Sequence, residues 1–433
     1  MTPEDRPPPT WAAIGVLLAL VALLLRLLAN VRGIDLDLFH EMALARELFQ
    51  TGSFPRDDVF AYVPTVSPTV HHEWGTGVVL YLLTDVLGGG LAALALLRLV
   101  LLGLIGWCSI QVARRRGATG VEVVVLAPLA ILLFWTGLSP VRAHFFTFAF
   151  LALLLWFLEE DRVGRRWWLL AWPVLVVLWL NLHAGFVVGA GMLGLYTLEA
   201  LLRTSREEGW DGAIRAHLHL VAATAIVPLL VVVNPYGFGY IPYLLHALFM
   251  DRPIIIEWRS LFVGDNLVEV FPFWLATVLI AAYAWLRATP EARRMPALLL
   301  LGVAALVALR SIRILPIYMV VWLAYVPPLL ATTPLAALLR RTWMRHARPL
   351  GAALGLAGVV GIGVALARGA PWVEVPVDPE GRNPYPAGAV AYLADEAFEG
   401  NVMTPFGVGA YVSWYLHPRV RVGLDSRYEV AYP

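Results

Sequence analysis

Long apolar runs, separated by short polar segments, make up most of the chain. A run of roughly 17–25 mostly apolar residues is long enough to cross a bilayer as a helix. Clear runs are 11–30, 91–112, 121–138, 184–202, 217–233, 268–287 and 349–367, and shorter or broken runs are 143–158, 167–182, 296–309 and 314–330. The pattern predicts an all-α polytopic membrane protein with about eleven transmembrane helices.

The composition agrees with a membrane protein and excludes several other classes. Hydrophobic residues make up 60% of the 433 residues and charged residues only 15%, against about 25% charged in soluble domains. The formal net charge of +1 gives no field that would attract nucleic acid. All basic residues are arginines, which excludes a Schiff-base lysine. The single cysteine, Cys108, lies in an apolar run and is expected to be a packed hydrophobic side chain.

Arginine clusters predict the orientation of the helices, because positively charged loops stay in the cytoplasm. The five clusters are Arg114–Arg116, Arg162/Arg165/Arg166, Arg203/Arg206/Arg215, Arg287/Arg293/Arg294 and Arg340/Arg341/Arg345/Arg348. The predicted spans put all five on the side of the N-terminus, provided that the short stretch 76–87 lies at the interface without crossing. We therefore expect a multi-pass protein of the cell membrane with a cytoplasmic N-terminus and an extracytoplasmic C-terminus.

The external side is expected to collect the polar segments, which are 31–75, 139–142, 181–185, 234–266, 310–313 and 368–433. The first external loop, 31–75, is long for a connector and contains a helical stretch at about 38–50. The chain thus divides into a transmembrane module, 1–370, and an extracytoplasmic α/β segment, 371–433.

Within the C-terminal segment, the pattern predicts a helix at 384–397 and strands at 401–416 and 419–431. The chain stops inside this strand-like pattern, as expected for a fragment of a longer protein.

Residues of the first external loop resemble the first loop of the GT-C glycosyltransferases, which include protein O-mannosyltransferases and the lipid A aminoarabinose transferase. Asp37 is followed by the sequence ALAREL at 43–48, by Thr51–Gly52 and by Pro55. The Asp-Glu pair of that family is broken here, because Leu38 stands in the glutamate position.

A closer resemblance is to uncharacterised bacterial membrane proteins of the same superfamily. The matching residues are Asp37, Gly52, Pro55, Asp58, Phe60, Tyr62, His72, Glu73 and Trp74, followed by Asn181-Leu-His183, Asn234-Pro-Tyr236-Gly, Glu257-Trp258 and Arg310-x-x-Arg313. The resemblance implies an inverting glycosyltransferase that moves a sugar from a polyprenyl-phosphate donor in the lipid bilayer to an extracytoplasmic acceptor of unknown identity. It also implies that an acidic residue of the first loop serves as the base.

Three carboxylates of the first loop are catalytic candidates for such a transfer. The acceptor hydroxyl must lose a proton as the anomeric bond breaks, and a nearby carboxylate can take it. Asp37 is the preferred base, although it is also placed to cap the helix that follows it. Asp35 is its rival. Glu73 and Asp58 are expected to assist, with capping of the turn after Pro55 as the alternative role of Asp58.

Three roles are possible for the cluster His71-His72-Glu73-Trp74. It could bind a divalent metal, hold a phosphate or the acceptor, or anchor 76–87 at the interface through Trp74. Adjacent histidines do not easily reach one metal, and no spaced third ligand follows. We therefore expect His72 and Trp74 to contact substrate, assign no metal ligands, and leave metal dependence open.

A leaving lipid phosphate needs positive charge. Arg310 and Arg313 lie between two apolar runs at the outer face and are expected to bind it, with Arg142 and Arg259 as second choices. The alternatives are ordinary headgroup contact or an ion pair with Glu257.

Two further residues, His183 and Tyr236, are predicted to contact substrate from separate external loops. Each also has an ordinary structural alternative. His183 could satisfy a helix end, and Tyr236 belongs to an Asn-Pro-Tyr-Gly turn.

Two other functions fit the pattern. A transporter or flippase of lipid-linked substrates would need charged groups deep in the membrane, where only Arg26 and Arg98 lie. A noncatalytic membrane assembly protein would use 371–433 to bind a partner, which the broken Asp-Glu pair permits.

Overall fold

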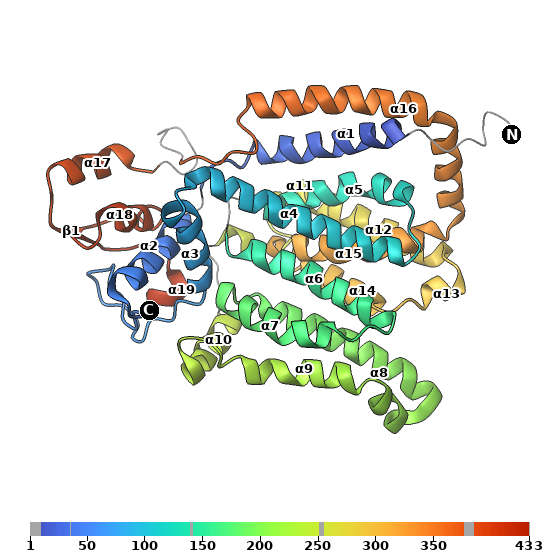
Figure 1. Ribbon diagram of the computed structural model, residues 1–433, viewed down its shortest axis with the longest axis horizontal. Helices are drawn as coiled ribbons and strands as arrows, with labels where there is room; N and C mark the ends of the chain where they lie inside the picture. The colour runs from blue at the N-terminus through green and yellow to red at the C-terminus, as the bar shows by residue number, and fades with distance from the viewer. Residues whose placement is uncertain (1–9, 35, 139–141, 251–254, 376–384, 433) are drawn as a thin grey trace.

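The computed structural model of the chain describes residues 10–34, 36–138, 142–250, 255–375 and 385–432. The fold is mostly helical, with long helices side by side in one bundle (Figure 1). Helices of the bundle are α1 (Thr10–Leu28), α4 (Gly90–Arg115), α5 (Gly120–Phe134), α6 (His144–Arg162), α7 (Trp168–Leu182), α8 (Phe186–Ala216), α9 (Leu218–Leu230), α12 (Phe271–Arg287), α14 (Leu298–Ala308), α15 (Leu315–Ala331) and α16 (Pro334–Ala367).

Shorter elements gather mainly at the two ends of the bundle. They are α2 (Leu36–Thr51), α3 (Trp74–Tyr81) with the π turn η2 (Leu82–Val86), α10 (Tyr240–Phe249), α11 (Asp265–Glu269), α13 (Pro290–Arg293), α17 (Ala387–Asp395), α18 (Gly409–Leu416), α19 (Tyr428–Ala431), the 3-10 turns η3 (Trp135–Gly137), η4 (Gly237–Gly239), η5 (Ile256–Trp258) and η6 (Ile312–Ile314), and the parallel strands β1 (Gly400–Val402) and β2 (Val420–Val422). Figure 1 shows α2, α3 and α17–α19 at one end, and the N-terminus of α1 and α13 at the other.

Six helices among the described residues are long and apolar enough to cross a membrane: α1, α4, α5 with η3, α8, α15 with η6, and α16. They indicate a multi-pass membrane protein. The other five runs predicted to cross are also helical, as α6, α7, α9, α12 and α14, and their crossing stays a prediction. The same holds for the orientation of the bundle in the membrane.

Helix α15 forms the centre of the bundle. Tyr318, Trp322 and Tyr325 are fully buried on it, and it packs against α4, α5, α12 and α14. Helices α1 and α16 pack closely against each other along one side of the bundle (Figure 1). There Gly15 faces the Gly351 backbone so closely that a Cβ at position 15 would lie 2.0 Å from the Gly351 carbonyl oxygen. This contact requires glycine.

Ion pairs join the predicted arginine clusters at the end of the bundle away from α2. Arg116 pairs with the buried Glu159 at 2.8 Å, and Arg340 pairs with the buried Glu122 at 2.7 Å. Arg203 donates to the Met295 carbonyl at 2.8 Å. The structure therefore brings clusters that were expected on one side of the membrane into mutual contact.

Buried Arg98 on α4 ties the polar segments to the bundle. Its guanidinium donates to the carbonyls of Val31 at 3.0 Å and Pro371 at 2.7 Å. The beginning of the first external loop and the beginning of the C-terminal segment are therefore held together. Both terminal nitrogens of this buried guanidinium are therefore used by backbone carbonyls.

The C-terminal segment is only partly as predicted. Helix α17 confirms the helix expected at 384–397, but the predicted strands are wrong for most of their length. Residues 409–416 form α18, and the chain ends in α19. Helix α18 is buried against α2 and β2, and a short, continuously apolar run does not by itself distinguish a buried helix from a strand. Helices α8 and α16 also extend through two arginine segments that were expected to be loops.

Candidate functional site

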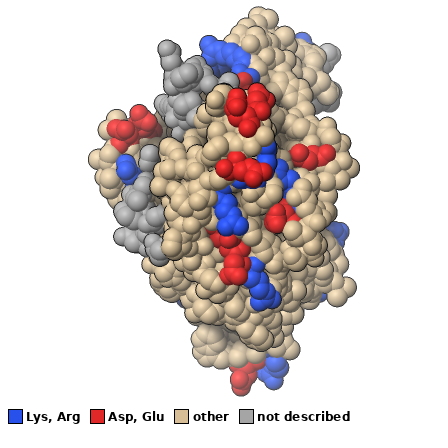
Figure 2. Space-filling model, turned by 90° about the vertical axis from the view of Figure 1, so that its left-hand side faces the viewer, with Lys and Arg blue, Asp and Glu red and all other residues tan. Residues whose placement is uncertain are grey.

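A cavity of about 300 Å³ lies where α2, the residues before α3, the start of α6 and the turn after α7 meet. Residues from α10, η5, η6 and the loop before α19 complete its wall. Figure 2 looks at this end of the molecule, where acidic and basic side chains gather along the middle, with uncharged residues on both sides. Of the residues predicted for the site, Asp37, His72, Glu73, Trp74, His183 and Arg313 line the cavity.

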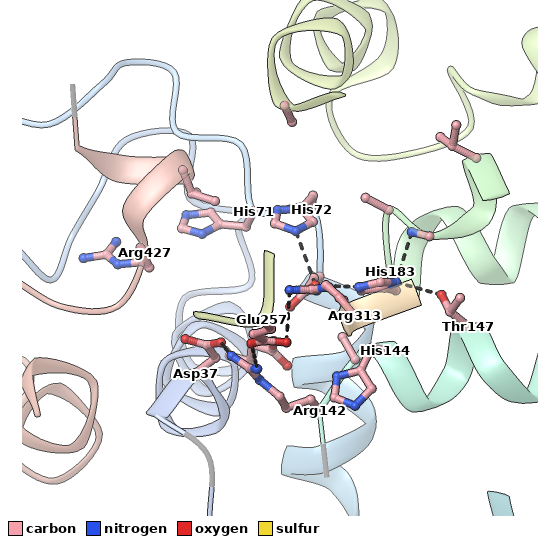
Figure 3. Close-up of a pocket in the computed structure, with 18 of the residues that line it drawn as sticks. Asp37, His71, His72, Arg142, His144, Thr147, His183, Glu257, Arg313 and Arg427 are labelled. Carbon is pink, nitrogen blue, oxygen red and sulfur yellow. Dashed lines mark hydrogen bonds and ion pairs between the residues drawn. The ribbon is translucent and has the colours of Figure 1, made fainter. Parts of the chain in front are cut away.

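Arg142 lies between two carboxylates of the cavity (Figure 3). It pairs with Asp37 at 2.5 Å and with Glu257 at 2.6 Å. Arg313 lies 3.6 Å from the other oxygen of Glu257 and packs over the Trp258 ring. Burial alone would raise the pKa of Glu257, but Arg142 and Arg313 lower it to about 2. Two guanidinium groups are therefore fixed on one wall of the cavity.

Two imidazoles face the carboxylate of Glu73. The Nε2 atoms of His72 and His183 lie 3.3 and 3.4 Å from the same oxygen of Glu73. The Gly185 N–H donates to Nδ1 of His183 at 3.0 Å, so the proton of the neutral ring is on Nε2 and points at Glu73. Tyr243 contacts Nδ1 of His72 at 2.7 Å, which favours the same tautomer there.

Glu41 and Glu73 share one proton. Burial raises the pKa of Glu41 well above its usual value, and the adjacent Glu73 raises it further. Burial would also raise the pKa of Glu73, but His72, a hydrogen bond from Glu41 and His183 hold it well below its usual value. These opposite shifts favour a protonated Glu41 carboxyl that donates to an ionised Glu73.

Glutamine substitutions should distinguish these two carboxyls. Glu41→Gln keeps a neutral donor and is expected to change the free energy of unfolding by less than about 1 kcal/mol. Glu73→Gln removes the charge that both imidazoles face and should cost about 1–3 kcal/mol. Thermal unfolding of the purified variants in one detergent measures the difference. Equal destabilisation by both would contradict the shared proton.

Asp58 does not line the cavity, but it fixes a residue that does. Its buried carboxylate pairs with Arg427, which also pairs with Asp425 at 2.6 Å. Asp58 accepts from the Phe60 and Ala61 N–H groups, both at 3.1 Å, which agrees with the capping alternative. Burial would raise the pKa of Asp58, but Arg427 holds it below its usual value. The first loop and the C-terminal segment are therefore locked together at the cavity.

The remaining predicted residues have supporting positions. Trp74 lines the cavity and donates through Nε1 to Asn181 at 2.9 Å. The Tyr236 hydroxyl accepts from the His71 N–H at 2.8 Å and is not part of the lining. Arg310 is exposed outside the cavity.

The structure shows where Asp37 lies relative to the start of α2. The helix begins at Leu36, so Asp37 lies in its first turn and is not the N-cap. Asp35, the rival base, lies outside the described residues.

Several side chains that line the cavity were not predicted from the sequence. Glu41 lies four residues after Asp37, a spacing that puts both on one helix face and could have predicted it. Thr147 accepts from Trp179 and contacts Nδ1 of His183 at 2.7 Å. Thr147 and Tyr243 come from distant helices, and no local pattern signals their role.

Within the described part of the chain, no group of three or more His, Cys, Asp or Glu side chains could hold a metal ion. No protein-family model, curated protein or solved structure matches the chain.

Proposed function

We propose that the chain is an integral membrane glycosyltransferase that moves a sugar from a polyprenyl-phosphate donor to an extracytoplasmic acceptor. The observation that supports this best is the pairing, in one cavity, of two fixed guanidinium groups with Asp37 and an ionised Glu73. A transfer from a lipid phosphate needs both a base for the acceptor and positive charge for the leaving group.

The proposed reaction is a single displacement. Asp37 takes the proton of the acceptor hydroxyl, whose oxygen attacks the anomeric carbon of the sugar. The bond from this carbon to the phosphate oxygen breaks, and its electron pair stays on the phosphate. Arg142 and Arg313 bind the phosphate as its charge grows. One displacement inverts the anomeric configuration.

The apolar part of the cavity suits a lipid carrier. Leu244 and Leu248 of α10 line it, together with Val187 of α8 and Ile317 of α15. Such side chains favour contact with a polyprenyl chain over water. The carrier would reach the arginines from this apolar side.

Two nearby arginines give a matched test of phosphate binding. Arg313 lines the cavity and Arg310 is exposed outside it. Arg313→Gln is expected to lower transfer about 10²-fold by removing a charge that stabilises the leaving phosphate. Arg310→Gln should leave the rate within about twofold of wild type. Membranes that contain each variant are given donor with a tritiated sugar, and label is counted in the aqueous and acceptor fractions.

The same assay separates the proposal from its rivals. A flippase would move labelled donor between leaflets without breaking the sugar–phosphate bond, and an assembly protein would leave the donor unchanged. Equal loss in both arginine variants would contradict the assignment of Arg313 to phosphate.

A further inference from the structure

One part of the cavity holds buried polar atoms that have no hydrogen-bond partner among the described residues. They are both ring nitrogens of His71, Nδ1 of His40, one carboxyl oxygen of Glu41 and the Ser426 hydroxyl. His71 is 3% exposed, Glu41 6% and His40 8%, and all four residues line the cavity. Each such atom destabilises the folded chain when no partner or solvent satisfies it. Their concentration in one cavity is typical of a site that a polar ligand completes.

The two imidazoles lie side by side in the cavity. Their ring centroids are 5.6 Å apart. The ring of His40 packs edge-on to Phe60, and the backbone N–H of His71 donates to Tyr236. Figure 3 shows His71 close to Arg427, on the side of the site away from His183 and Thr147. The atoms without a partner therefore lie on one surface of the cavity, separate from the hydrogen-bonded His183.

This surface is neutral. Burial and, to a smaller extent, the charge of Arg427 lower the pKa of His71 to about 3. The same two causes keep the pKa of His40 well below its usual value. Each neutral ring therefore offers one N–H and one bare nitrogen. Arg427 itself is occupied by Asp58 and Asp425.

We infer that His40, His71, Glu41 and Ser426 form a subsite for the hydroxyl groups of an uncharged sugar. Hydroxyls both donate and accept, and so match neutral imidazoles, a protonated carboxyl and a serine. A carboxylate on the sugar would be buried beside an Arg427 that Asp58 and Asp425 already occupy, which is costly. An ammonium would have to compete for Glu73 with His72 and His183, which already face its carboxylate. The inference rests on the proposed function and names the class of sugar that the donor carries.

Binding to the purified chain in nanodiscs tests the subsite without turnover. The probes are polyprenyl phosphate, polyprenyl-phosphate glucose and polyprenyl-phosphate 4-amino-4-deoxyarabinose. Polyprenyl-phosphate glucose is expected to bind about tenfold more tightly than bare polyprenyl phosphate, because a few hydrogen bonds to the sugar contribute that much affinity. The conjugate of the amino sugar should show no such gain. His71→Phe should abolish the gain and leave the affinity for polyprenyl phosphate unchanged. The control is His246→Phe, at an exposed position of α10. This variant should keep the gain in affinity from glucose.

The melting temperature of each variant shows that it is folded, and His40→Phe replaces His71→Phe if the latter does not fold. A full glucose gain in the folded variant, or equal affinity for the amino sugar, would overturn the subsite. A glucose gain that depends on His71 but is accompanied by no transfer to any acceptor would support the subsite and contradict the transferase. Failure of all three lipids to bind would contradict both.

Discussion

Replacement of Asp37 by asparagine is expected to lower the rate of sugar transfer about 10²–10⁴-fold, the usual contribution of a positioned general base. Asparagine has nearly the same shape but cannot take the acceptor proton. Arg142 keeps its ion pair with Glu257 at 2.6 Å, so the phosphate-binding wall should stay in place. The loss is therefore expected in kcat, with little change in the affinity for polyprenyl phosphate. Initial rates with the tritiated donor and binding of the bare lipid phosphate measure the two quantities.

Asp57→Asn is the matched control for this substitution. Asp57 belongs to the same loop but is exposed and accepts from Ser67 at 2.6 Å. The Asp57→Asn variant should transfer sugar at about the wild-type rate. If Asp37→Asn retained full activity, Asp37 would not be the base, and the ionised Glu73 would be the next candidate.

Loss of Arg427 should have the largest effect on stability. Arg427→Leu leaves the buried carboxylates of Asp58 and Asp425 without their counter-charge. Removing one partner of a buried ion pair costs about 3–5 kcal/mol. Because this pair joins the first loop to the C-terminal segment, both should become sensitive to protease. Thermal unfolding and limited proteolysis in detergent test this result.

Arg421→Leu, at an exposed residue of β2, is the control and should melt within about 2 °C of wild type.

The stabilisation by Asp58 depends on pH with a definite sign. The pKa of Asp58 is lower in the folded state, so its stabilising contribution is present above the ordinary Asp pKa of about 3.9. This contribution is lost as the pH falls through the lowered value. In acid, the melting temperature of the wild type should fall more than that of Arg427→Leu. An equal fall in both would argue against the ion pair.

The long elements of the fold were predictable because length and apolar content dominate them. Each of the eleven runs became a helix, and the helical stretch of the first loop became α2. The C-terminal strands failed because α18 is an apolar run of eight residues buried against α2. Its conformation is decided by packing rather than by alternation.

The candidate site was predictable where one loop supplied it. Asp37 and Glu73 both belong to 31–75, and both line the cavity. Which arginine faces inward was not predictable, because η6 turns the chain so that Arg313 points at Glu257 while Arg310 stays exposed. The lowered pKa of Glu73 depends on the adjacent His72 and also on His183, which comes from more than a hundred positions further along the chain.

The most direct test of the proposed function is transfer by the purified chain in liposomes. The donor is polyprenyl phosphate carrying a tritiated sugar, and the acceptor source is a total extract of cell envelope. The proposal predicts that label leaves the lipid, that bare polyprenyl phosphate accumulates, and that the product has the inverted anomeric configuration. Label that stays on the donor at the level of protein-free liposomes, or a product with retained configuration, would contradict it.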